Sequence, residues 1–402
     1  MAASVSGSPQ RGGRPALRGS TPSIARDTEI EAIIETCTRF LPGHGYRPTR
    51  ELLATIAADT RVDYYGLGGV VHDLEAEVAA LLGKQAALFV PSGTMAQQAT
   101  LRVHGDRRGR HTVVYHPACH LDSHEERGYQ RLHGLFGVPV GPRNEPLSVS
   151  NLSQVKEPVA ALLIELPQRD LGGVLPTWDE LLAQVAWARE RGAAVHLDGA
   201  RLWESTPYYN KSLAEIAVLF DSVYVSFYKG LGGIAGCCVA GEADVIAEVS
   251  TWRTRHGGRL FALWPYAASA QTVLHARLPR MPKYYRHAVA IGKALRDLPG
   301  VEVLPNPVQT PMMHLRLSVG LDQLRTRALD IAKAEKIWTF ARPFVSEGPS
   351  LQRIEFPVGD ATLEFHPREV RALVERLVSE SGTVAKPPAS RRKTAASQHP
   401  AR

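Results

Sequence analysis

The sequence lacks a long apolar run and is poor in cysteine. None of its apolar stretches approaches the roughly 20 residues that a membrane-spanning helix requires, so no membrane partner is expected. The 4 cysteines form no Cys-x-x-Cys pair, and adjacent cysteines such as Cys237 and Cys238 rarely bridge each other for geometric reasons. A His-Glu-x-x-His motif is missing too, which leaves no spacing that supports a metal site. We therefore expect buried thiols in a cytoplasmic protein without a resident metal.

Acidic residues are missing from both ends of the chain. Residues 1–26 carry four arginines and residues 381–402 carry five lysines and arginines. These nine charges exceed the formal net charge of +7, so residues 27–380 carry about −2. Nucleic-acid binding as the main function would need a basic groove on the folded body. Nucleic acid is therefore not an expected partner.

The two tails also lack large apolar residues. They are rich in Gly, Ser, Pro and Ala, a composition that predicts disorder. The N-terminal tail has no apolar core of a secretory signal, although its arginines and serines would also suit an organelle transit peptide.

Between the tails the composition is that of a globular enzyme, with 44% hydrophobic and 22% charged residues overall. Strands and helices alternate from about 74 to 240, which predicts an α/β fold with a mostly parallel sheet covered on both faces. After Trp252 the pattern changes to that of a smaller α+β domain. The predicted organisation is a disordered basic tail at 1–26, an N-terminal segment and large domain at 27–260, a small C-terminal domain at 261–380, and a second disordered tail at 381–402.

Two predicted strands end in residues of opposite charge. Val195–Leu197 leads to Asp198, and Ser222–Ser226 leads to Lys229 in a glycine-rich turn. The carboxyl edge of such a sheet is where α/β enzymes bind ligands. Pyridoxal phosphate needs one lysine for its aldehyde and one acid for its pyridine nitrogen. The alternative is a surface lysine in a turn and an aspartate that caps a helix.

A second pattern joins a strand to a helix through small polar residues. The predicted strand Ala86–Val90 is followed by Ser92, Gly93 and Thr94 and then by a helix over Met95–His104. Hydroxyls and backbone N–H groups at a helix N-terminus form a phosphate-binding cup. Plain capping of the helix by Ser92 or Thr94 is the alternative.

Three histidines recur four residues apart after the strand at 112–115. His116, His120 and His124 could suggest a metal site, but this spacing alone is a weak signal. One histidine that packs on a cofactor ring is the better functional interpretation. Histidines on a solvated helix face are the alternative without function.

Taken together, three ordered motifs resemble the threonine aldolase and β-eliminating lyase group of fold-type-I pyridoxal-phosphate enzymes. They are YYGLGGVVHDLEAEVAALLGKQAALFVPSGTMAQQ, HLDGARLW and SFYKGLGG. The resemblance implies a fold-type-I large domain with a smaller C-terminal domain, pyridoxal 5′-phosphate as cofactor, a small amino-acid substrate, and a homodimer or homotetramer.

The resemblance also assigns site residues. Lys229 matches the lysine that holds the cofactor aldehyde, Asp198 the acid on its ring nitrogen, and His120 the histidine stacked on its ring. Cofactor contacts are expected from Ser92, Gly93, Thr94, His120, Glu165, Asp198, Arg201 and Lys229. Arg201 and Arg353 are expected to bind the substrate carboxylate, and Lys229 and His120 are the expected catalytic residues.

The sequence departs from the family at three places. The family's histidine that handles the β-hydroxyl proton is Gln168 here, and an amide cannot act as a base at neutral pH. Tyr228 replaces the serine before the lysine, and Pro42–Gly45 replaces a Ser-Asp pair. His120, His124 and Glu125 are candidate proton carriers in its place.

The expected activity is that of a carbon–carbon lyase, which cleaves a β-hydroxy-α-amino acid to glycine and an aldehyde. β-Elimination of a C–S or C–O bond, a cofactor-binding relative without activity, and an interaction protein without cofactor are the alternatives.

Overall fold

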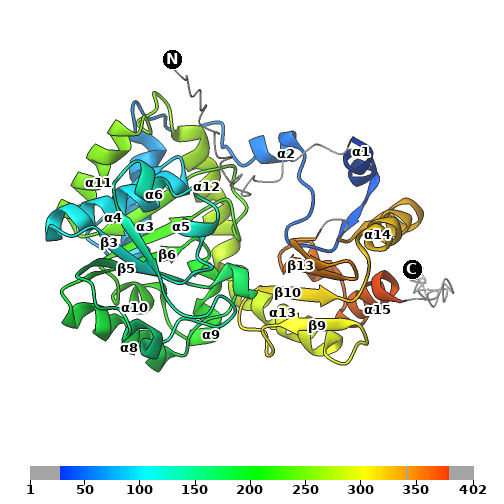
Figure 1. Cartoon of the computed structure of the whole chain (residues 1–402). Coiled ribbons are helices and arrows are strands. Elements are labelled where there is room, and N and C mark those ends of the chain that lie inside the picture. The colour runs from blue at the N-terminus through cyan, green and yellow to red at the C-terminus, as the bar shows by residue number, and fades with distance from the viewer. Residues whose placement is uncertain (1–27, 341–342, 380–402) are drawn as a thin grey trace, which may run out of the picture.

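The computed structural model describes residues 28–340 and 343–379, so the two tails predicted to be disordered lie outside the described residues. The large domain is built on a seven-stranded sheet with the order β2-β8-β7-β6-β5-β3-β4 (Figure 1). Only β8 runs antiparallel to its neighbours among these strands. The strands are β2 Ala86–Val90, β3 Thr112–Tyr115, β4 Phe136–Pro139, β5 Val159–Glu165, β6 Ala194–Gly199, β7 Ser222–Ser226 and β8 Cys237–Gly241.

Helices cover both faces of this sheet. Every residue of β5, β6 and β7 is buried, as expected for parallel strands that are covered on both sides. On one face α4 and α11 pack on β2, β7 and β8 through one apolar cluster. The helices are α1 Thr28–Thr36, α2 Thr49–Leu53, α3 Gly69–Leu82, α4 Gly93–Arg108, α5 His120–Ser123, α6 Gly128–Arg131, α7 Val149–Leu152, α8 Trp178–Glu190, α9 Thr206–Tyr209, α10 Leu213–Ala217, α11 Ala243–Arg255, α12 Trp264–Arg277, α13 Met281–Leu295, α14 Leu321–Glu335 and α15 Pro367–Val378.

The small domain contains an antiparallel sheet with the order β12-β13-β10-β9. Its strands are β9 Val301–Leu304, β10 Met312–Leu317, β12 Val345–Gly348 and β13 Leu351–Pro357. The N-terminal segment joins this part of the molecule. Helix α1 packs on α14, and β1 (Arg39–Phe40) pairs in parallel with β11 (Ile337–Trp338). The domain boundaries given above stay a prediction.

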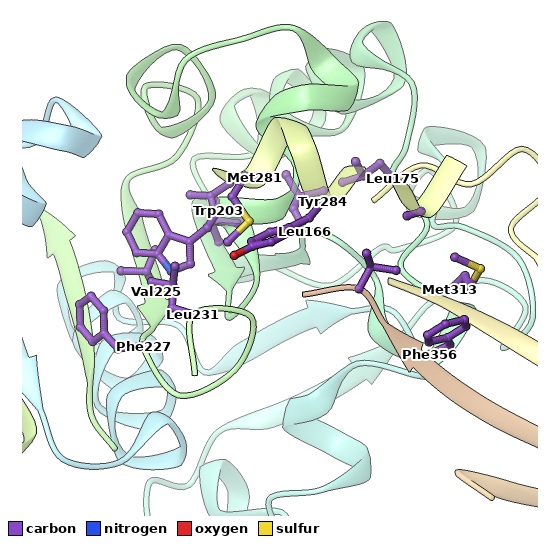
Figure 2. Packing of buried hydrophobic residues seen from close by; sticks show 14 of the residues in the cluster. Leu166, Leu175, Trp203, Val225, Phe227, Leu231, Met281, Tyr284, Met313 and Phe356 are labelled. Atoms are coloured by element: carbon purple, nitrogen blue, oxygen red, sulfur yellow. The ribbon is translucent and has the colours of Figure 1, made fainter. Parts of the chain in front are cut away.

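One continuous apolar core connects the two domains. It runs from α3 and α8 of the large domain through the loop after β7 to β10 and β13 of the small one. Figure 2 shows part of this junction, where Trp203, Leu166, Tyr284 and Phe356 lie in the same region. Because this core is shared, the loops at the carboxyl edge of the large sheet have the small domain as a fixed neighbour.

The mostly parallel α/β sheet with a separate α+β domain is confirmed. In the sequence, Asp73 directly precedes an apolar run with helical spacing and predicts a helix that it caps from Leu74. This local prediction is wrong, because α3 begins at Gly69 and Asp73 pairs with Arg61 on its surface (2.5 Å). The reason is Gly68, whose positive φ of 76° makes the turn five residues earlier.

The sequence pattern over 268–296 predicts one helical stretch, and this prediction is also wrong, because two helices occupy the region. Helices α12 and α13 are separated by a 3₁₀ turn, Leu278–Arg280, and Pro279 and Pro282 lie at this junction. Proline has no N–H to continue the hydrogen-bond ladder. No helix in the described ranges is long and apolar enough to cross a bilayer.

Candidate active site

The carboxyl edge of the large sheet brings Asp198 and Lys229 into one cavity. Gly93, Thr94, His120 and both of these residues line it. The register explains the convergence, because β6 and β7 pair in parallel with Asp198 beside Tyr224, and Lys229 follows shortly after the end of β7 at the same edge. The sequence prediction that these strand ends meet is therefore confirmed.

Lys229 has the electrostatic surroundings of a reactive amine. Burial, followed by the charges of Arg201 and Arg169, lowers its pKa to about 8. A neutral amine is the form that attacks an aldehyde. The side chain is thus prepared to form a Schiff base near neutral pH.

Asp198 is a buried carboxylate that lines the same cavity as Lys229. It is 2% exposed, and Ala200 N donates a hydrogen bond to its Oδ1 (3.1 Å). Burial raises its pKa, while His120 and Lys229 act in the opposite direction. A protonated pyridine nitrogen would supply a charge partner here.

The expected phosphate cup lies at the N-terminus of α4. Gly93 packs so closely on the Tyr224 hydroxyl that a methyl group at this position would overlap it. Thr94 lines the cavity, but Ser92 is not among the described residues that do, and its side chain makes no capping hydrogen bond. Capping of α4 by the Ser92 side chain, the alternative to a phosphate cup, is therefore not observed.

Three cofactor-side residues were missed by sequence reasoning. Gln97, Tyr224 and Tyr228 line the cavity beside Thr94. The Gln97 Nε2 group is buried and has no hydrogen-bond partner among the described residues, so a phosphate oxygen would satisfy it. Gln97 lies three residues after Thr94 on one helix face, a spacing that could have revealed it.

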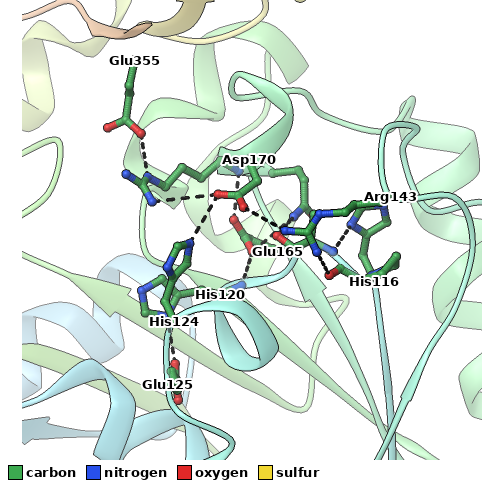
Figure 3. Close-up of polar contacts among 12 residues, drawn as sticks. His116, His120, His124, Glu125, Arg143, Glu165, Asp170 and Glu355 are labelled. Atoms are coloured by element: carbon green, nitrogen blue, oxygen red, sulfur yellow. Dashed lines mark hydrogen bonds and ion pairs between the residues drawn. The ribbon is translucent and has the colours of Figure 1, made fainter. Parts of the chain in front are cut away.

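His120 is held by an acid behind it. Its Nδ1 lies 3.0 Å from Glu125 Oε1, and its backbone N donates to Glu165 Oε2 (3.1 Å) (Figure 3). Burial alone would lower the pKa of His120, but the bond to Glu125 and the charges of Asp198 and Glu165 outweigh it and raise the pKa. The His120 ring therefore lies in the cavity and is protonated more readily than an ordinary histidine.

The three spaced histidines do not meet at one point, although the rings of His120 and His124 lie 5.1 Å apart. His116 bonds through Nε2 to the carbonyls of Pro142 and Glu145 (3.0 and 2.8 Å), whereas His124 pairs with Asp170 (3.7 Å) (Figure 3). In the described parts of the chain, no group of three or more His, Cys, Asp or Glu is arranged to hold a metal ion.

Two arginines and a glutamate lie beside Lys229. Arg169 Nε donates to Glu355 Oε2 (2.6 Å), and Arg201 Nη2 lies 3.5 Å from Glu355 Oε1. Arg353, expected to bind substrate, instead donates to Asp170 O (3.2 Å) and pairs with Glu347 (3.2 Å). It is not among the described residues that line the cavities around Lys229.

A second cavity of about 350 Å³ opens on the other side of Lys229. Arg201, Tyr228 and Lys229 line both cavities, so the two spaces meet at the reactive amine. His44 and Glu355 come from the N-terminal segment and the small domain. No local pattern in the sequence could place these two residues, because their positions depend on domain packing.

The turn after Lys229 is held at three successive carbonyls. His44 Nε2 bonds Gly230 O (2.8 Å), Arg277 Nη1 donates to Leu231 O, and Arg47 Nη2 donates to Gly232 O. His44 Nδ1 and Arg277 Nε also lie 3.3 and 2.9 Å from Asp360 Oδ2. The lysine therefore stands on a backbone that other segments keep in place.

The Gln97 Nε2 group without a partner in the described part of the chain, the buried Asp198 carboxylate and the low-pKa lysine in one cavity fit pyridoxal phosphate. The fold and the site thus define a pyridoxal-phosphate-dependent enzyme of fold type I. The family model described as beta-eliminating lyase matches residues 47–318. The chain belongs to this family.

Curated and solved relatives agree with this assignment. A putative L-allo-threonine aldolase from Listeria monocytogenes superposes with a TM-score of 0.82 at 37% identity, over 87% of this chain and 98% of the other. The low specificity L-threonine aldolase of Escherichia coli K12 is 30% identical over 67% of this chain and 82% of its own length. Aldolase vrtJ of Penicillium aethiopicum is 35% identical over 57% of this chain, and the match spans 61% of that protein.

Proposed function

We propose that the protein cleaves the Cα–Cβ bond of a β-hydroxy-α-amino acid, giving glycine and an aldehyde. The observation that carries this is the 350 Å³ cavity that begins at Lys229 and Arg201, since it offers space for a side chain beyond Cα. Two of the relatives are named L-threonine aldolases, one of them putatively. This supports aldol-type cleavage over β-elimination.

The chain's own residues would share the work as follows. When bound, pyridoxal phosphate supplies an electron sink for the bond that breaks. Lys229 would hold its aldehyde and Asp198 its ring nitrogen, while Thr94 and Gln97 would hold its phosphate. Arg201 would fix the substrate carboxylate as a fork, and thereby orient the scissile bond.

The test is product formation from a β-hydroxy amino acid. The protein with pyridoxal phosphate should release glycine and an aldehyde from threonine, and Lys229→Ala should lose both this activity and the visible absorbance of the bound cofactor. Pyruvate from a β-substituted alanine, without aldehyde from threonine, would instead support β-elimination. A coloured protein that turns over no amino acid would support a cofactor-binding relative.

We also propose a homodimer or homotetramer in the cytoplasm. Tyr64, Leu67 and Phe261 are 60, 64 and 61% exposed and come together from two distant segments, which supports a contact with a second subunit. All four cysteines are free and buried, which is common in a reducing compartment. The proposed domain boundary near residue 260 is supported by the separate antiparallel sheet.

A further inference from the structure

Cleavage requires a residue that receives the β-hydroxyl proton, and the histidine that does so in the family is Gln168 in this chain. Gln168 donates to Ala118 O (3.1 Å) and Glu165 Oε2 (3.4 Å), so its amide is neither basic nor free. Of the candidates in the sequence, His120 and Glu125 bind each other (3.0 Å) and line the other cavity, and His124 pairs with Asp170. The groups that line the 350 Å³ cavity are therefore the remaining candidates for this proton.

Most polar side chains of this cavity are already engaged. Both ring nitrogens of His44 have partners, with Gly230 O at 2.8 Å and Asp360 N at 3.2 Å. Tyr284 donates its hydroxyl to Asp360, and burial raises the pKa of this phenol. Arg47 and Arg201 stay protonated at any working pH.

Glu355 is engaged as well. Its two oxygens face Arg169 (2.6 Å) and Arg201 (3.5 Å). Burial works to raise its pKa, but the two arginines outweigh burial and lower it. A carboxylate held in this way is a weak base.

Glu204 differs from all of these groups. It ends the 3₁₀ turn Leu202–Glu204, is 4% exposed and lines the cavity. Its Oε1 packs against Gly230, where a methyl group would overlap it, so the carboxylate lies beside the backbone of the residue that follows Lys229. The nearest cation is Arg201 Nε at 4.0 Å, and none of the described groups donates a hydrogen bond to the carboxylate.

We propose that the Glu204 carboxylate is the catalytic base for the β-hydroxyl proton, a role that rests on the proposed aldol cleavage. As Glu204 takes the proton, the oxygen of the former hydroxyl becomes the carbonyl oxygen of the aldehyde. The Cα–Cβ bond breaks and its electron pair stays with Cα, which then takes up a proton to give glycine. One proton leaves the hydroxyl and one enters Cα, so no other reactant is needed.

The electrostatics of Glu204 suit this task. Burial raises its pKa to about 7, Arg201 opposes the rise and Glu355 adds to it. The other titratable or charged groups that line the same cavity are His44, Arg47, Tyr228, Lys229 and Tyr284. A base with a pKa near the working pH combines sufficient ionisation with a strong pull on the proton.

The experiment compares Glu204→Gln, Glu204→Asp and the matched control Glu75→Gln, all loaded with pyridoxal phosphate. Glu75 is also a mostly buried glutamate whose pKa burial raises to about 7, but it lies on α3 and accepts from Phe89 N (2.7 Å). Wild-type kcat for threonine cleavage should rise as the pH passes 7. Glu204→Gln should lose about 100-fold or more and this rise with it, Glu204→Asp should retain part, and Glu75→Gln should match the wild type.

Two further measurements separate catalysis from folding. Exchange of the glycine α-hydrogen in heavy water involves no β-hydroxyl, so Glu204→Gln should retain it. In cofactor-free protein, both glutamine variants should become more stable relative to the wild type as the pH rises from 5 to 8. The reason is that the wild type has a buried carboxyl group whose ionisation destabilises the folded state, and the glutamine side chain does not ionise.

Three results would overturn the role of Glu204: cleavage by Glu204→Gln at the wild-type rate, an equal loss of glycine exchange, or an equal loss in Glu75→Gln. A wild-type protein that releases no aldehyde at all would instead refute the proposed function itself.

Discussion

At the scale of single residues, the site depends on charges that burial has made unusual. Lys229 is a buried amine between Arg201 and Arg169, and its pKa is lowered to about 8. Asp198 is a buried carboxylate whose pKa is raised by that burial. Asp198 is therefore suited to a cationic partner, and Lys229 is suited to react as a neutral amine.

The low pKa of Lys229 predicts the pH dependence of cofactor uptake. The rate at which cofactor-free protein condenses with pyridoxal phosphate should rise with pH and be half-maximal near pH 8, because only the neutral amine attacks. Arg169→Gln removes a positive charge and should move this midpoint to higher pH. Arg316→Gln, which breaks surface ion pairs with Glu302 and Glu347, is the control. Stopped-flow absorbance measures both, and an unchanged midpoint in Arg169→Gln would contradict the assigned cause.

Residues at strand ends could be predicted from the sequence, whereas residues placed by packing could not. Asp198 and Lys229 each follow a short apolar strand, and parallel strands end at one edge. Glu355 reaches the site only because β13 of the small domain packs over the loop that bears Arg169. Glu204 was overlooked because a glutamate in a short turn after a motif has no local pattern that distinguishes it from a surface acid.

At the scale of elements, the turn after Lys229 depends on Asp360. This carboxylate binds His44, Arg277, Arg280 and Tyr284. Burial alone would raise its pKa, but the contact with His44 and the hydrogen bonds from Tyr284 and Arg277 lower it well below the ordinary value. Asp360 thus organises the side chains that hold the turn.

Asp360→Asn should destabilise the protein by about 1–3 kcal/mol at pH 7, the range for hydrogen bonds to a charged group. Since the pKa of Asp360 is lowered on folding, its contribution is present above the unfolded pKa and is lost as the pH falls through the folded value. The difference between variant and wild type should therefore narrow below about pH 4. Urea unfolding at several pH values measures it.

Asp244→Asn serves as the control for this measurement. Asp244 pairs with Arg107 at the surface (3.0 Å) and its side chain is 70% exposed, so its loss should leave the stability close to that of the wild type. An equal loss in both variants would show that Asp360 has no special role.

Elements were predicted best where burial sets the pattern. The buried strands β6 and β7 are built around buried apolar residues, and they lie close to the strands predicted at Val195–Leu197 and Ser222–Ser226. The strand β12 was missed because it is a largely exposed edge strand with the sequence VSEG. The start of helix α3 was predicted five residues too far along the chain, because glycines rather than an N-cap side chain begin this helix.

At the scale of the whole molecule, one apolar patch stays uncovered in the single chain. Tyr65 N donates to Phe261 O (2.9 Å), and the rings of Tyr64 and Tyr65 lie 5.7 and 5.4 Å from that of Phe261. Leu67 belongs to the same turn and is 64% exposed. These contacts shape an apolar surface directly before α3 and α12.

The combined variant Leu67→Glu and Phe261→Glu should be a monomer, because two charges in an apolar interface stay unpaired. Analytical ultracentrifugation of this variant and of the wild type measures the change. Val218→Glu, at an apolar position that is 65% exposed on another part of the surface, should leave the assembly intact. A wild-type protein that sediments as a monomer would contradict the proposed interface.

The N-terminal segment contacts both domains. Its β1 strand is paired with β11, while His44 and Arg47, a few residues later, hold the carbonyls of Gly230 and Gly232. Any displacement of the small domain is thereby transmitted to the peptide units that carry the reactive amine. Residues 39–47, far from the catalytic motifs in sequence, thus help to position the reactive lysine.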